Sequence, residues 1–373
     1  MRYFDFAATA PMSPLAIKGY AEAAAGIIGN ASSLHDEGSR AADLLDWSRC
    51  TVAKAFHVSD KSVIFTSGGS ESNQLAIQTL LSNIDKGKNH IIASRLEHAS
   101  ILQELDYLSS QGYQIDFLRH HEDGSVDLTH LQKLVNEKTG LAVIQHANSE
   151  IGIIQPLEQI AAITKKNNCL LHIDCVQSFG KISCREAAAY GDSLAVSSHK
   201  LHGPKGVGAL ILPSSRTIHP ARTGISHESG YRAGTANVPG IYSFALAVQE
   251  SHDLLEENCA HVQRLRSFCQ QTICRHSTAF EVIQGQRQLP HILCLFSSDL
   301  AGQYVMMELN RRGYYISSGS ACQSGSKSPS KAMLAIGKNE DEARGSIRIS
   351  LSKQHTLEDC SGLMRTLMTI VHT

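Results

Sequence analysis

Residues 141–174 read L-A-V-I-Q-H-A-N-S-E-I-G-I-I-Q-P-L-E-Q-I-A-A-I-T-K-K-N-N-C-L-L-H-I-D, and this stretch decides the fold. Apolar runs at 141–146 and 169–174 predict two buried strands, and the amphipathic segment at 156–167 between them predicts a helix. A strand, a crossover helix and a second strand make a βαβ unit, whose two strands are parallel.

The same alternation extends from residue 13 to about residue 257. Ser13 followed by Pro14 predicts a helix start, and Gly29 would close that helix. Further apolar runs predict strands at 62–66, 90–94, 114–118 and 193–197, with helices at 99–111 and 127–137, and a strand at 206–213 hairpinned back onto the sheet. We therefore expect a large α/β domain over 13–257, with a mainly parallel sheet covered on both faces.

A second, smaller unit is expected after a long helix that runs from Val238 to about Asn258. It contains predicted strands at 291–296, near 314–317 and at 346–351, a helix at 300–312 and a last helix. This order predicts a smaller α+β domain made of residues 258–373 together with residues 1–12. The segment 317–330 is rich in serine and glycine.

The composition excludes several classes of protein. Hydrophobic residues make up 42% of the 373 and charged residues 18%, which permits a large core. Lys and Arg total 34 against 35 Asp and Glu, so the net charge of -1 argues against nucleic acid or an anionic membrane as the main ligand. No signal-peptide pattern opens the chain, and no run approaches the ~18 apolar residues of a membrane span. We expect a soluble, cytoplasmic protein.

Ten cysteines need an explanation in a chain of this length. None stand in a C-x-x-C or other paired zinc spacing, and a disulfide framework is typical of short secreted chains. We expect most of them to be small buried side chains, which leaves room for one reactive thiol, and we expect no metal site.

Three segments carry side chains suited to chemistry. The first, F-T-S-G-G-S-E-S (65–72), places small residues between a strand and a helix, where free backbone N–H groups can bind a phosphate. Turns of this composition also precede many helices that bind nothing. The segment alone therefore indicates only a candidate phosphate site.

The second segment places Asp174 at the carboxyl end of an apolar strand and Gln177 just beyond it. Ligands of open α/β sheets bind at such strand ends, and a buried carboxylate is costly unless a cationic group meets it. The alternative is an aspartate that only caps the next helix.

The third segment, S-S-H-K-L-H-G-P-K-G (197–206), places Lys200 after a strand. A partly desolvated lysine has a lowered pKa and can form a Schiff base with an aldehyde. The alternatives are a solvated loop lysine and a zinc site at His199 and His202 that lacks an identifiable third ligand. Taken together, a phosphate cradle, an acid for a pyridinium nitrogen and a lysine for an aldehyde match three groups of pyridoxal 5'-phosphate.

Ten motifs, in order along nearly the whole chain, resemble those of the cysteine desulfurases, a group of class V aminotransferases. They are D-F-A-A-T-A-P (5–11), G-N-A-S-S-L-H (29–35), F-T-S-G-G-S-E-S-N-Q-L-A-I (65–77), L-E-H-A-S (96–100), N-S-E-I-G-I-I-Q-P (148–156), H-I-D-C-V-Q (172–177), S-S-H-K-L-H-G-P-K-G-V-G-A-L (197–210), R-A-G-T-A-N-V-P-G-I (232–241), S-S-G-S-A-C (317–322) and S-I-R-I-S-L (346–351). The resemblance implies the fold-type-I architecture of pyridoxal-phosphate enzymes, with a seven-stranded, mainly parallel sheet in the large domain and an active homodimer.

The resemblance also implies a role for each matched residue. Lys200 would bond to the cofactor aldehyde, Asp174 would pair with the pyridinium nitrogen, and Gln177 would hydrogen-bond the phenolic oxygen. His98 would stack on the ring and move protons, a task that suits an imidazole, whereas by itself it reads as a helix cap. The phosphate would be held by Gly69, Ser70, Ser197 and His199, and by Thr235 of the partner subunit.

Two further residues would bind the substrate. Arg348 matches the family's clamp for the substrate carboxylate, since a guanidinium can make two bonds to it; without the resemblance it reads as a surface arginine. The family's asparagine beside the ring and the substrate falls on Asn148, with Ser149 as the alternative, because this chain has Asn148-Ser149-Glu150 where two asparagines are usual.

Cys322, in the segment rich in serine and glycine, is the expected nucleophile. In the implied reaction its thiolate attacks the sulfur of bound L-cysteine, L-alanine leaves, and a persulfide stays on the enzyme. Attack requires a thiolate that is accessible, and a flexible segment suits delivery of the sulfur. The alternative is a linker with an incidental cysteine.

The sequence thus predicts a homodimeric cysteine desulfurase that passes sulfur to an acceptor protein, for iron–sulfur clusters or for thiolation of tRNA or cofactors. The alternatives with the same fold are a selenocysteine lyase and a class V aminotransferase. A non-enzymatic scaffold is the alternative of a different class, and Lys200 argues against it. We expect no membrane partner and no direct nucleic-acid partner.

Overall fold

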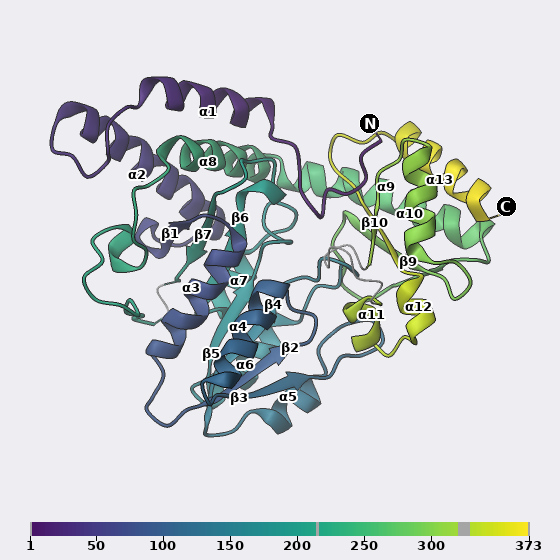
Figure 1. Cartoon of the computed structure of the whole chain (residues 1–373), viewed down its shortest axis with the longest axis horizontal. Helices are drawn as coiled ribbons and strands as arrows, with labels where there is room; N and C mark the ends of the chain where they lie inside the picture. The colour runs from purple at the N-terminus through teal and green to yellow at the C-terminus, as the bar shows by residue number, and fades with distance from the viewer. Residues whose placement is uncertain (1, 214–215, 320–328, 372–373) are drawn as a thin grey trace.

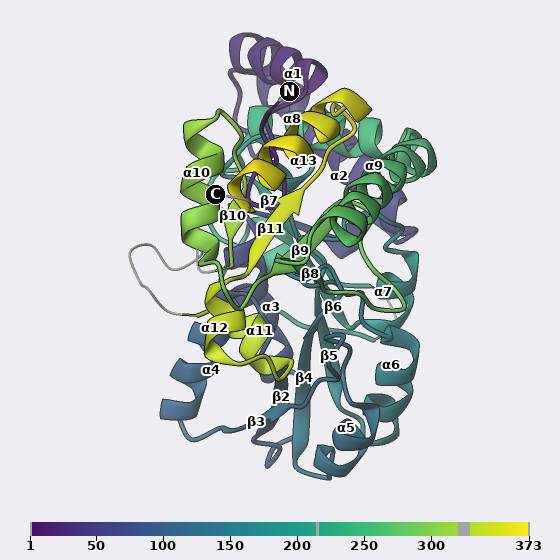
Figure 2. The ribbon, with the colours of Figure 1, turned by 90° about the vertical axis from the view of Figure 1, so that its right-hand side faces the viewer.

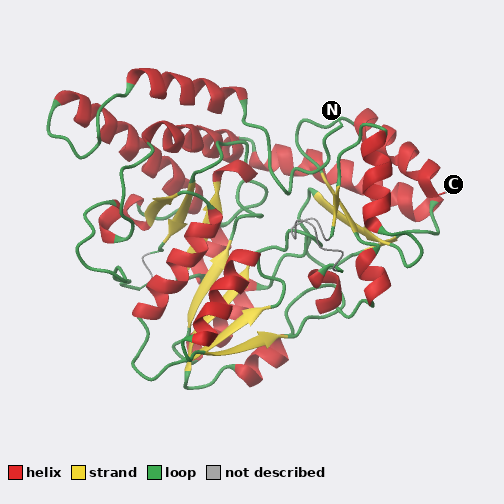
Figure 3. Ribbon diagram, viewed as in Figure 1, coloured by secondary structure: helices red, strands yellow, loops and turns green. Residues whose placement is uncertain are grey.

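The computed structural model describes residues 2–213, 216–319 and 329–371. Two sheets organise these residues into a larger and a smaller unit that lie side by side (Figures 1 and 3). The strands of the larger sheet are β1 (Val63–Thr66), β2 (His90–Ser94), β3 (Gln114–Leu118), β4 (Thr139–Gln145), β5 (Leu170–Asp174), β6 (Ser193–Ser197) and β7 (Gly208–Ile211).

The larger sheet has the strand order β1-β7-β6-β5-β4-β2-β3. β7 runs antiparallel to both of its neighbours, and the other neighbouring pairs are parallel. The expected seven-stranded, mainly parallel sheet is confirmed, including the strand that folds back onto it. Each strand lies within two residues of its expected range, because a short apolar run between polar turns has little freedom in where it starts.

Helices cover both faces of this sheet, because alternate strand residues point to opposite sides. Ile144, Ile173 and Val196 contribute to the core on one face, which α2 (Asp36–Phe56), α5 (Leu128–Leu134), α6 (Leu157–Lys166), α7 (Arg185–Tyr190) and α8 (Val238–Asp253) cover. Val143 belongs to the core on the other face, under α3 (Gly69–Ser82) and α4 (Ala99–Ser110).

The first two helices differ from the expectation. α1 (Pro14–Gly26) begins where Ser13 Oγ accepts the N–H of Ala16, but it ends at Gly26 rather than at Gly29. No helix is expected from the sequence over the residues of α2. Its buried face includes small or polar residues such as Ala41 and Ser48, so its apolar periodicity is weak although it packs closely on α8.

The single helix expected from Val238 to about Asn258 is two helices. α8 ends at Asp253, Leu254 leaves the helical conformation with φ −110° and ψ 16°, and α9 (Leu255–His276) carries the chain across to the smaller unit. The turn at Leu254 was missed because no glycine or proline marks it.

The smaller unit contains β8 (Glu281–Val282), β9 (Ile292–Phe296), α10 (Gly302–Arg311), β10 (Ser317–Ser318), α11 (Lys331–Ala335), α12 (Glu340–Arg344), β11 (Ile347–Ser350) and α13 (Leu357–Val371). Its strands form a four-stranded sheet with the order β10-β11-β9-β8. The core of this unit lies among the sheet, α9, α10 and α13 (Figure 2).

The N-terminal strip packs against the smaller unit. Phe4 belongs to its core, and single β-bridges join Tyr3 to Tyr315 and Asp5 to Ser350. These contacts support our proposal that residues 1–12 form one domain with 258–373, while 13–257 form the other. No helix in the described part of the chain combines the length and apolar character needed to cross a membrane.

Candidate active site

A cavity of about 400 Å³ lies where the carboxyl ends of β4, β5 and β6 meet the N-terminus of α3. The smaller unit contributes Ser317 and Arg348 to its wall, and the N-terminal strip contributes Asp5, Ala7 and Ala8. Nine of the residues expected to form the site line this cavity: Gly69, Ser70, His98, Asp174, Gln177, Ser197, His199, Lys200 and Arg348.

The N-terminus of α3 forms a cradle of small residues. Gly68 precedes the helix with φ 152°, which L side chains rarely adopt, and provides no side-chain cap for the first N–H groups. A Cβ added at Gly69 would lie 2.7 Å from Val176 Cγ2, so a side chain there would close the space. Open N–H groups, the adjacent hydroxyls of Ser70 and Ser197, and this space suit a phosphate group.

Asp174 is held at the end of β5 by hydrogen bonds to both carboxylate oxygens. Oδ1 accepts from the N–H of Val176 at 2.8 Å, and Oδ2 accepts from Asn73 Nδ2 at 2.9 Å. Glu97, nearby and fully buried, has a pKa raised well above its usual range by burial and by the negative charge of Asp174. Burial therefore favours the neutral form of Glu97 beside the Asp174 carboxylate.

Lys200 ends a 3₁₀ turn, η2 (Ser198–Lys200), that follows β6 directly. Its Nζ donates to the carbonyls of Ala7 at 2.5 Å and Ala8 at 2.8 Å, so the N-terminal strip holds the amine at the cavity. His199 Nδ1 pairs with Thr9 Oγ1 at 3.0 Å. Burial and the positive charge of Lys200 lower the pKa of His199 to about 4, so its ring is neutral at pH 7 and acts through hydrogen bonds.

His98 and Gln177 reach the cavity from two different elements. His98 caps α4, because its Nδ1 accepts the N–H of Ser100 at 3.2 Å, and its ring also lines the cavity. The two interpretations of His98 are therefore compatible. Gln177 donates to the carbonyl of Ala7 at 3.2 Å and pairs through Oε1 with His291 Nε2 at 3.3 Å.

Arg348 lies in the middle of the second sheet with only 5% of its surface exposed. One guanidinium nitrogen donates to the carbonyl of Ser149 at 2.9 Å, and the other forms an ion pair with Asp5 at 2.6 Å. Its Nε is buried without a hydrogen-bond partner. A buried guanidinium with an unsatisfied donor on a cavity wall suits an anionic ligand.

Two of the expected site residues do not line the cavity, and a third is not described. Asn148 is buried outside the cavity wall, because its Oδ1 accepts the N–H groups of Glu150 and Ile151 in a turn. Ser149 lines the cavity instead. Thr235 is exposed and does not line the cavity of this single chain, and Cys322 lies outside the described residues.

The zinc alternative at His199 and His202 finds no support. His202 Nδ1 bonds to the carbonyl of Pro11, while His199 bonds to Thr9. Within the part of the chain that the structure describes, neither histidine belongs to a group of three potential metal ligands.

Asn73 and Asp5 are site residues that no role in the sequence motifs predicts. Asn73 follows Gly69 by four residues and so lies one turn along the same face of α3. That spacing was a signal that could have placed it beside Asp174. Asp5 opens the motif D-F-A-A-T-A-P, but only the packing of the strip against β11 brings it to Arg348.

Most described thiols are buried and inert. Burial raises the pKa of Cys169 and of Cys294 to about 12, so neither is a thiolate at neutral pH. Cys184 departs from this pattern, because hydrogen bonds to Cys175, His146 and Ser178 lower its pKa to about 5. The nine described cysteines form no disulfide.

The chain resembles known proteins over nearly its whole length. The model of the class-V aminotransferases matches residues 2–363. A putative cysteine desulfurase NifS of Bacillus subtilis (strain 168) is 39% identical over 373 residues, which cover 99% of this chain and 94% of the relative. A solved NifS-like protein superposes with a TM-score of 0.92 at 32% identity, covering both chains completely. SspA, solved in complex with cysteine, has a TM-score of 0.81 at 29% identity, covering 95% of this chain and all of that one.

Proposed function

This chain belongs to the class-V aminotransferase family, and from that membership we propose that it is a cysteine desulfurase that uses pyridoxal 5'-phosphate. The observation that carries the proposal is that Lys200, Asp174 and the cradle of α3 line one cavity. Relatives named as cysteine desulfurases favour this activity over a selenocysteine lyase or an aminotransferase.

The residues of the cavity fit the three polar parts of this cofactor. The space that a Cβ at Gly69 would fill suits the phosphate, Asp174 would hold a proton at the ring nitrogen, and Lys200 would bind the aldehyde. When bound, pyridoxal phosphate supplies a carbonyl for amines and a ring that withdraws electrons from the substrate carbon. The hydrogen bond from Asn73 keeps the Asp174 carboxylate oriented for this pairing.

The remaining cavity residues would act on the substrate. Arg348 would clamp the carboxylate of L-cysteine, and Ser149 rather than Asn148 lies on the wall beside it. Because Ser100 fixes Nδ1 of His98, Nε2 is the atom left to hold and move a proton. Gln177, tethered to Ala7, would hydrogen-bond the phenolic oxygen.

We assign the nucleophile to Cys322. The chain enters the segment that carries it at Ser317 in the cavity wall, and beyond it Ser330 donates to Glu150, next to Ser149. The Cys322 thiolate would attack the sulfur of bound L-cysteine, forming a sulfur–sulfur bond as the carbon–sulfur bond breaks. The electron pair stays on carbon, which takes up a proton, so that L-alanine leaves and a persulfide remains on Cys322.

Mass spectrometry after addition of L-cysteine without reductant tests this function. We expect one added sulfur atom on the peptide that carries Cys322 and an equal amount of L-alanine. Cys322→Ser should still bind cysteine but release no sulfide, and Lys200→Ala should lose the yellow colour of the loaded enzyme. A colourless wild-type protein that cannot be reconstituted with pyridoxal phosphate would contradict the proposal.

A homodimer is the proposed active form. Large apolar side chains are exposed on α1 and between α1 and α2: Ile17 is 53% exposed, Ile28 81% and Leu34 fully. Such a patch is typical of a protein–protein interface. Thr235, exposed in one chain, would then complete the phosphate site across the interface.

Mixing two inactive variants tests the shared site. Chains with Lys200→Ala and chains with Thr235→Asp should each be inactive alone, but a mixed dimer contains one site with both native residues. We expect activity to reappear on mixing, with a dimer mass by light scattering. A monomer in solution would contradict this proposal.

The persulfide would pass to an acceptor protein, and we place the reaction in the cytoplasm, where thiols stay reduced.

A further inference from the structure

A second group of side chains lies outside the lining of the candidate active site, and the proposed function does not use it. His146 follows β4, Cys175 follows β5, and Cys184 immediately precedes α7. Their exposed fractions are 1%, 0% and 3%. One nitrogen of His146 and the two sulfur atoms all lie within 4.8 Å of one another.

A fourth donor completes the group. Ser178 Oγ lies 2.9 Å from His146 Nδ1 and 3.6 Å from Cys184 Sγ, and Cys184 Sγ lies 3.9 Å from His146 Nδ1. Around a tetrahedral zinc ion, with bonds of about 2.0–2.3 Å, neighbouring donors are roughly 3.3–3.8 Å apart. The three spacings of 2.9, 3.6 and 3.9 Å lie within about 0.5 Å of that range, and Cys175 Sγ lies within 4.8 Å of the other two ligand atoms of the group.

The backbone around this group is fixed before any ion enters. The N–H of His146 donates to the carbonyl of Asp174, and the N–H of Phe179 donates to that of Cys175. Ala188 in α7 donates to the carbonyl of Cys184. Ligands held on ordered elements lose little conformational freedom on binding, which favours a specific site.

The ligand atoms of this group indicate which kind of metal ion it would bind. Two thiols and an imidazole are ligands for thiophilic ions, whereas Mg²⁺ and Ca²⁺ prefer oxygen. Because the site is fully buried, the charge of ion and ligands should cancel. Two thiolates balance one divalent cation, which favours Zn²⁺ over the monovalent Cu⁺.

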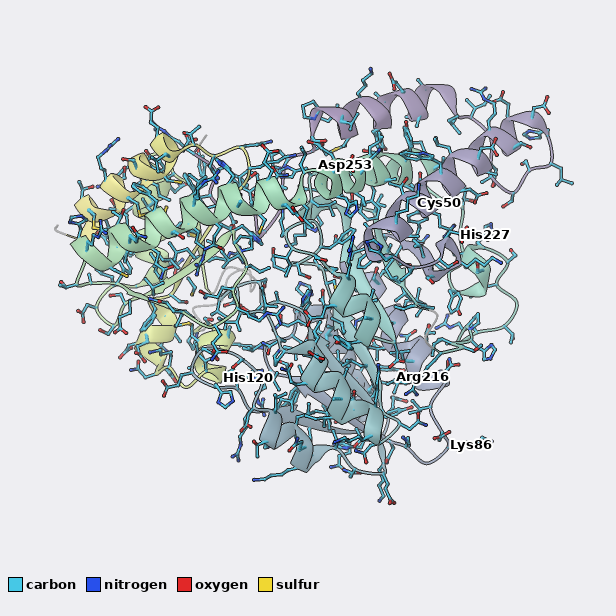
Figure 4. All side chains as sticks on the ribbon, turned by 180° about the vertical axis from the view of Figure 1, so that it is seen from behind. Cys50, Lys86, His120, Arg216, His227 and Asp253 are labelled. Atoms are coloured by element: carbon cyan, nitrogen blue, oxygen red, sulfur yellow. The ribbon has the colours of Figure 1, made fainter. Side chains whose placement is uncertain are left out.

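The group also borders a second cavity, through which an ion could enter. Cys184 and Ser183 line a separate cavity of about 940 Å³ that extends to the junction of α8 and α9. The exposed acidic residues Asp253, Glu256 and Glu257 line its outer part. Figure 4, the view from behind, labels Asp253 at this junction. Negative charge at an opening raises the local concentration of cations.

We propose that His146, Cys175, Cys184 and Ser178 bind one Zn²⁺ ion. Binding forms two zinc–sulfur bonds, one zinc–nitrogen bond and one zinc–oxygen bond to the Ser178 hydroxyl, and it releases to the buffer any proton that the two thiols still carry, with no change of oxidation state. The ion would join the end of β4 to the turn that carries Asp174 and Gln177. The sequence carries no spacing motif for such a site, because the ligands come from three separate segments.

Metal content of the full-length, cofactor-loaded protein tests the proposal, in a Cys322→Ser background that removes the expected reactive thiol. After incubation with Zn²⁺ and dialysis, we expect one zinc per chain. Titration with Cd²⁺ should give the ultraviolet absorption of cadmium–thiolate bonds. Cys184→Ala and Cys175→Ala should each weaken binding at least a hundredfold. Cys259→Ala is the matched control, because Cys259 lines the same large cavity but is not in the group, and it should keep the zinc.

Near-ultraviolet circular dichroism and retained cofactor colour show which variants are folded. The test can be made if either Cys184→Ala or Cys175→Ala is folded. Absence of zinc in the parent protein, zinc retained in a folded Cys184→Ala or Cys175→Ala, or equal loss in Cys259→Ala would each overturn the proposal. So would a disulfide between Cys175 and Cys184 in the protein as purified from reducing buffer.

Discussion

Asn73 shows how one residue outside the reacting set can govern the chemistry of the site. Its Nδ2 donates to Asp174, and its Oδ1 pairs with Nε2 of the buried His172 at 3.1 Å. Burial lowers the pKa of His172 to about 3, so the ring is neutral and pairs with the amide without adding charge. The charge of Asp174 is therefore oriented by neutral dipoles and is left to meet a cationic ligand.

His98→Ala tests the proton role at this scale. We expect alanine formation to fall about 10²- to 10⁴-fold, because a positioned general acid–base group is removed. The cofactor colour should persist, since the phosphate, aldehyde and ring-nitrogen contacts remain. Ser100→Ala, which removes only the hydroxyl beside Nδ1, should have a smaller effect. Equal losses of cofactor and turnover in His98→Ala would show a structural role instead.

Arg348→Lys tests the carboxylate clamp. A lysine keeps the charge but loses the fork and the bond to Ser149, so KM for L-cysteine should rise roughly 10- to 100-fold, the worth of one charged hydrogen bond. Steady-state kinetics should show a smaller change in kcat. Arg344→Lys, at a half-exposed arginine of α12, is the control and should leave KM unchanged. An unchanged KM in Arg348→Lys would remove this residue from the substrate site.

At the scale of elements, the site depends on how closely the start of α3 approaches its neighbours. A Cβ on Gly208 of β7 would lie 2.7 Å from Gly68 Cα, so glycine lets the strand pass directly beneath the cradle. Gly69 then sits against Val176 in the turn after β5. The cradle is thus formed jointly by α3, β7 and the turn after Asp174. It stays open because Gly69 and Gly208 have no side chains to fill it.

Gly69→Ala tests this packing. The added methyl group would press on Val176 and enter the phosphate space, and overpacking of this kind costs about 1–3 kcal/mol. The Kd for pyridoxal phosphate, measured by absorbance titration, should rise roughly 5- to 150-fold. Gly26→Ala at the end of α1 meets no atom within 4 Å and should leave the Kd unchanged. An unchanged Kd for Gly69→Ala would move the phosphate elsewhere.

At the scale of the whole molecule, buried neutral histidines join distant parts of the chain. His355 donates from Nε2 to the carbonyl of Tyr3 and stacks on Phe4, with ring centres 4.2 Å apart. His202 bonds to Pro11 in the same N-terminal strip. Burial lowers the pKa of both histidines to about 4. Protonation therefore opposes the packing of the strip on the rest of the protein.

These histidines predict a pH dependence of stability. In the unfolded chain their pKa is about 6.5, so between pH 6.5 and about 4 the unfolded state binds more protons than the folded one. The contribution of these two histidines to the free energy of unfolding is fully present above pH 6.5. Below pH 6.5 it should fall by roughly 1.4 kcal/mol per pH unit for each histidine, down to a pH of about 4. Urea unfolding from pH 7.5 to 4.5 measures the slope. His355→Gln should reduce it, and His219→Gln, at an exposed position, should not; equal slopes in all three proteins would contradict the prediction.

Whether a feature of the structure can be predicted from the sequence depends on whether local or long-range interactions define it. The strands and most helices of the larger unit followed from apolar periodicity, since a two-residue or 3.6-residue repeat is a local property. Nine of the expected site residues, Lys200 and Asp174 among them, also line one cavity, because the carboxyl ends of parallel strands share one edge of a sheet. The break at Leu254 and the helix α2 were missed, since tertiary packing rather than a local pattern defines them.

The sequence by itself determined the fold class and the chemical types of the site residues, which depend on neighbouring residues and short motifs. Only the tertiary structure decided that Ser149 rather than Asn148 faces the cavity, because a turn consumes the hydrogen bonds of Asn148. It also decided that Asp5 meets Arg348 and that His146 meets Cys175 and Cys184. These partners belong to separate elements, and the packing of those elements against one another, which no local repeat records, brings the side chains within reach.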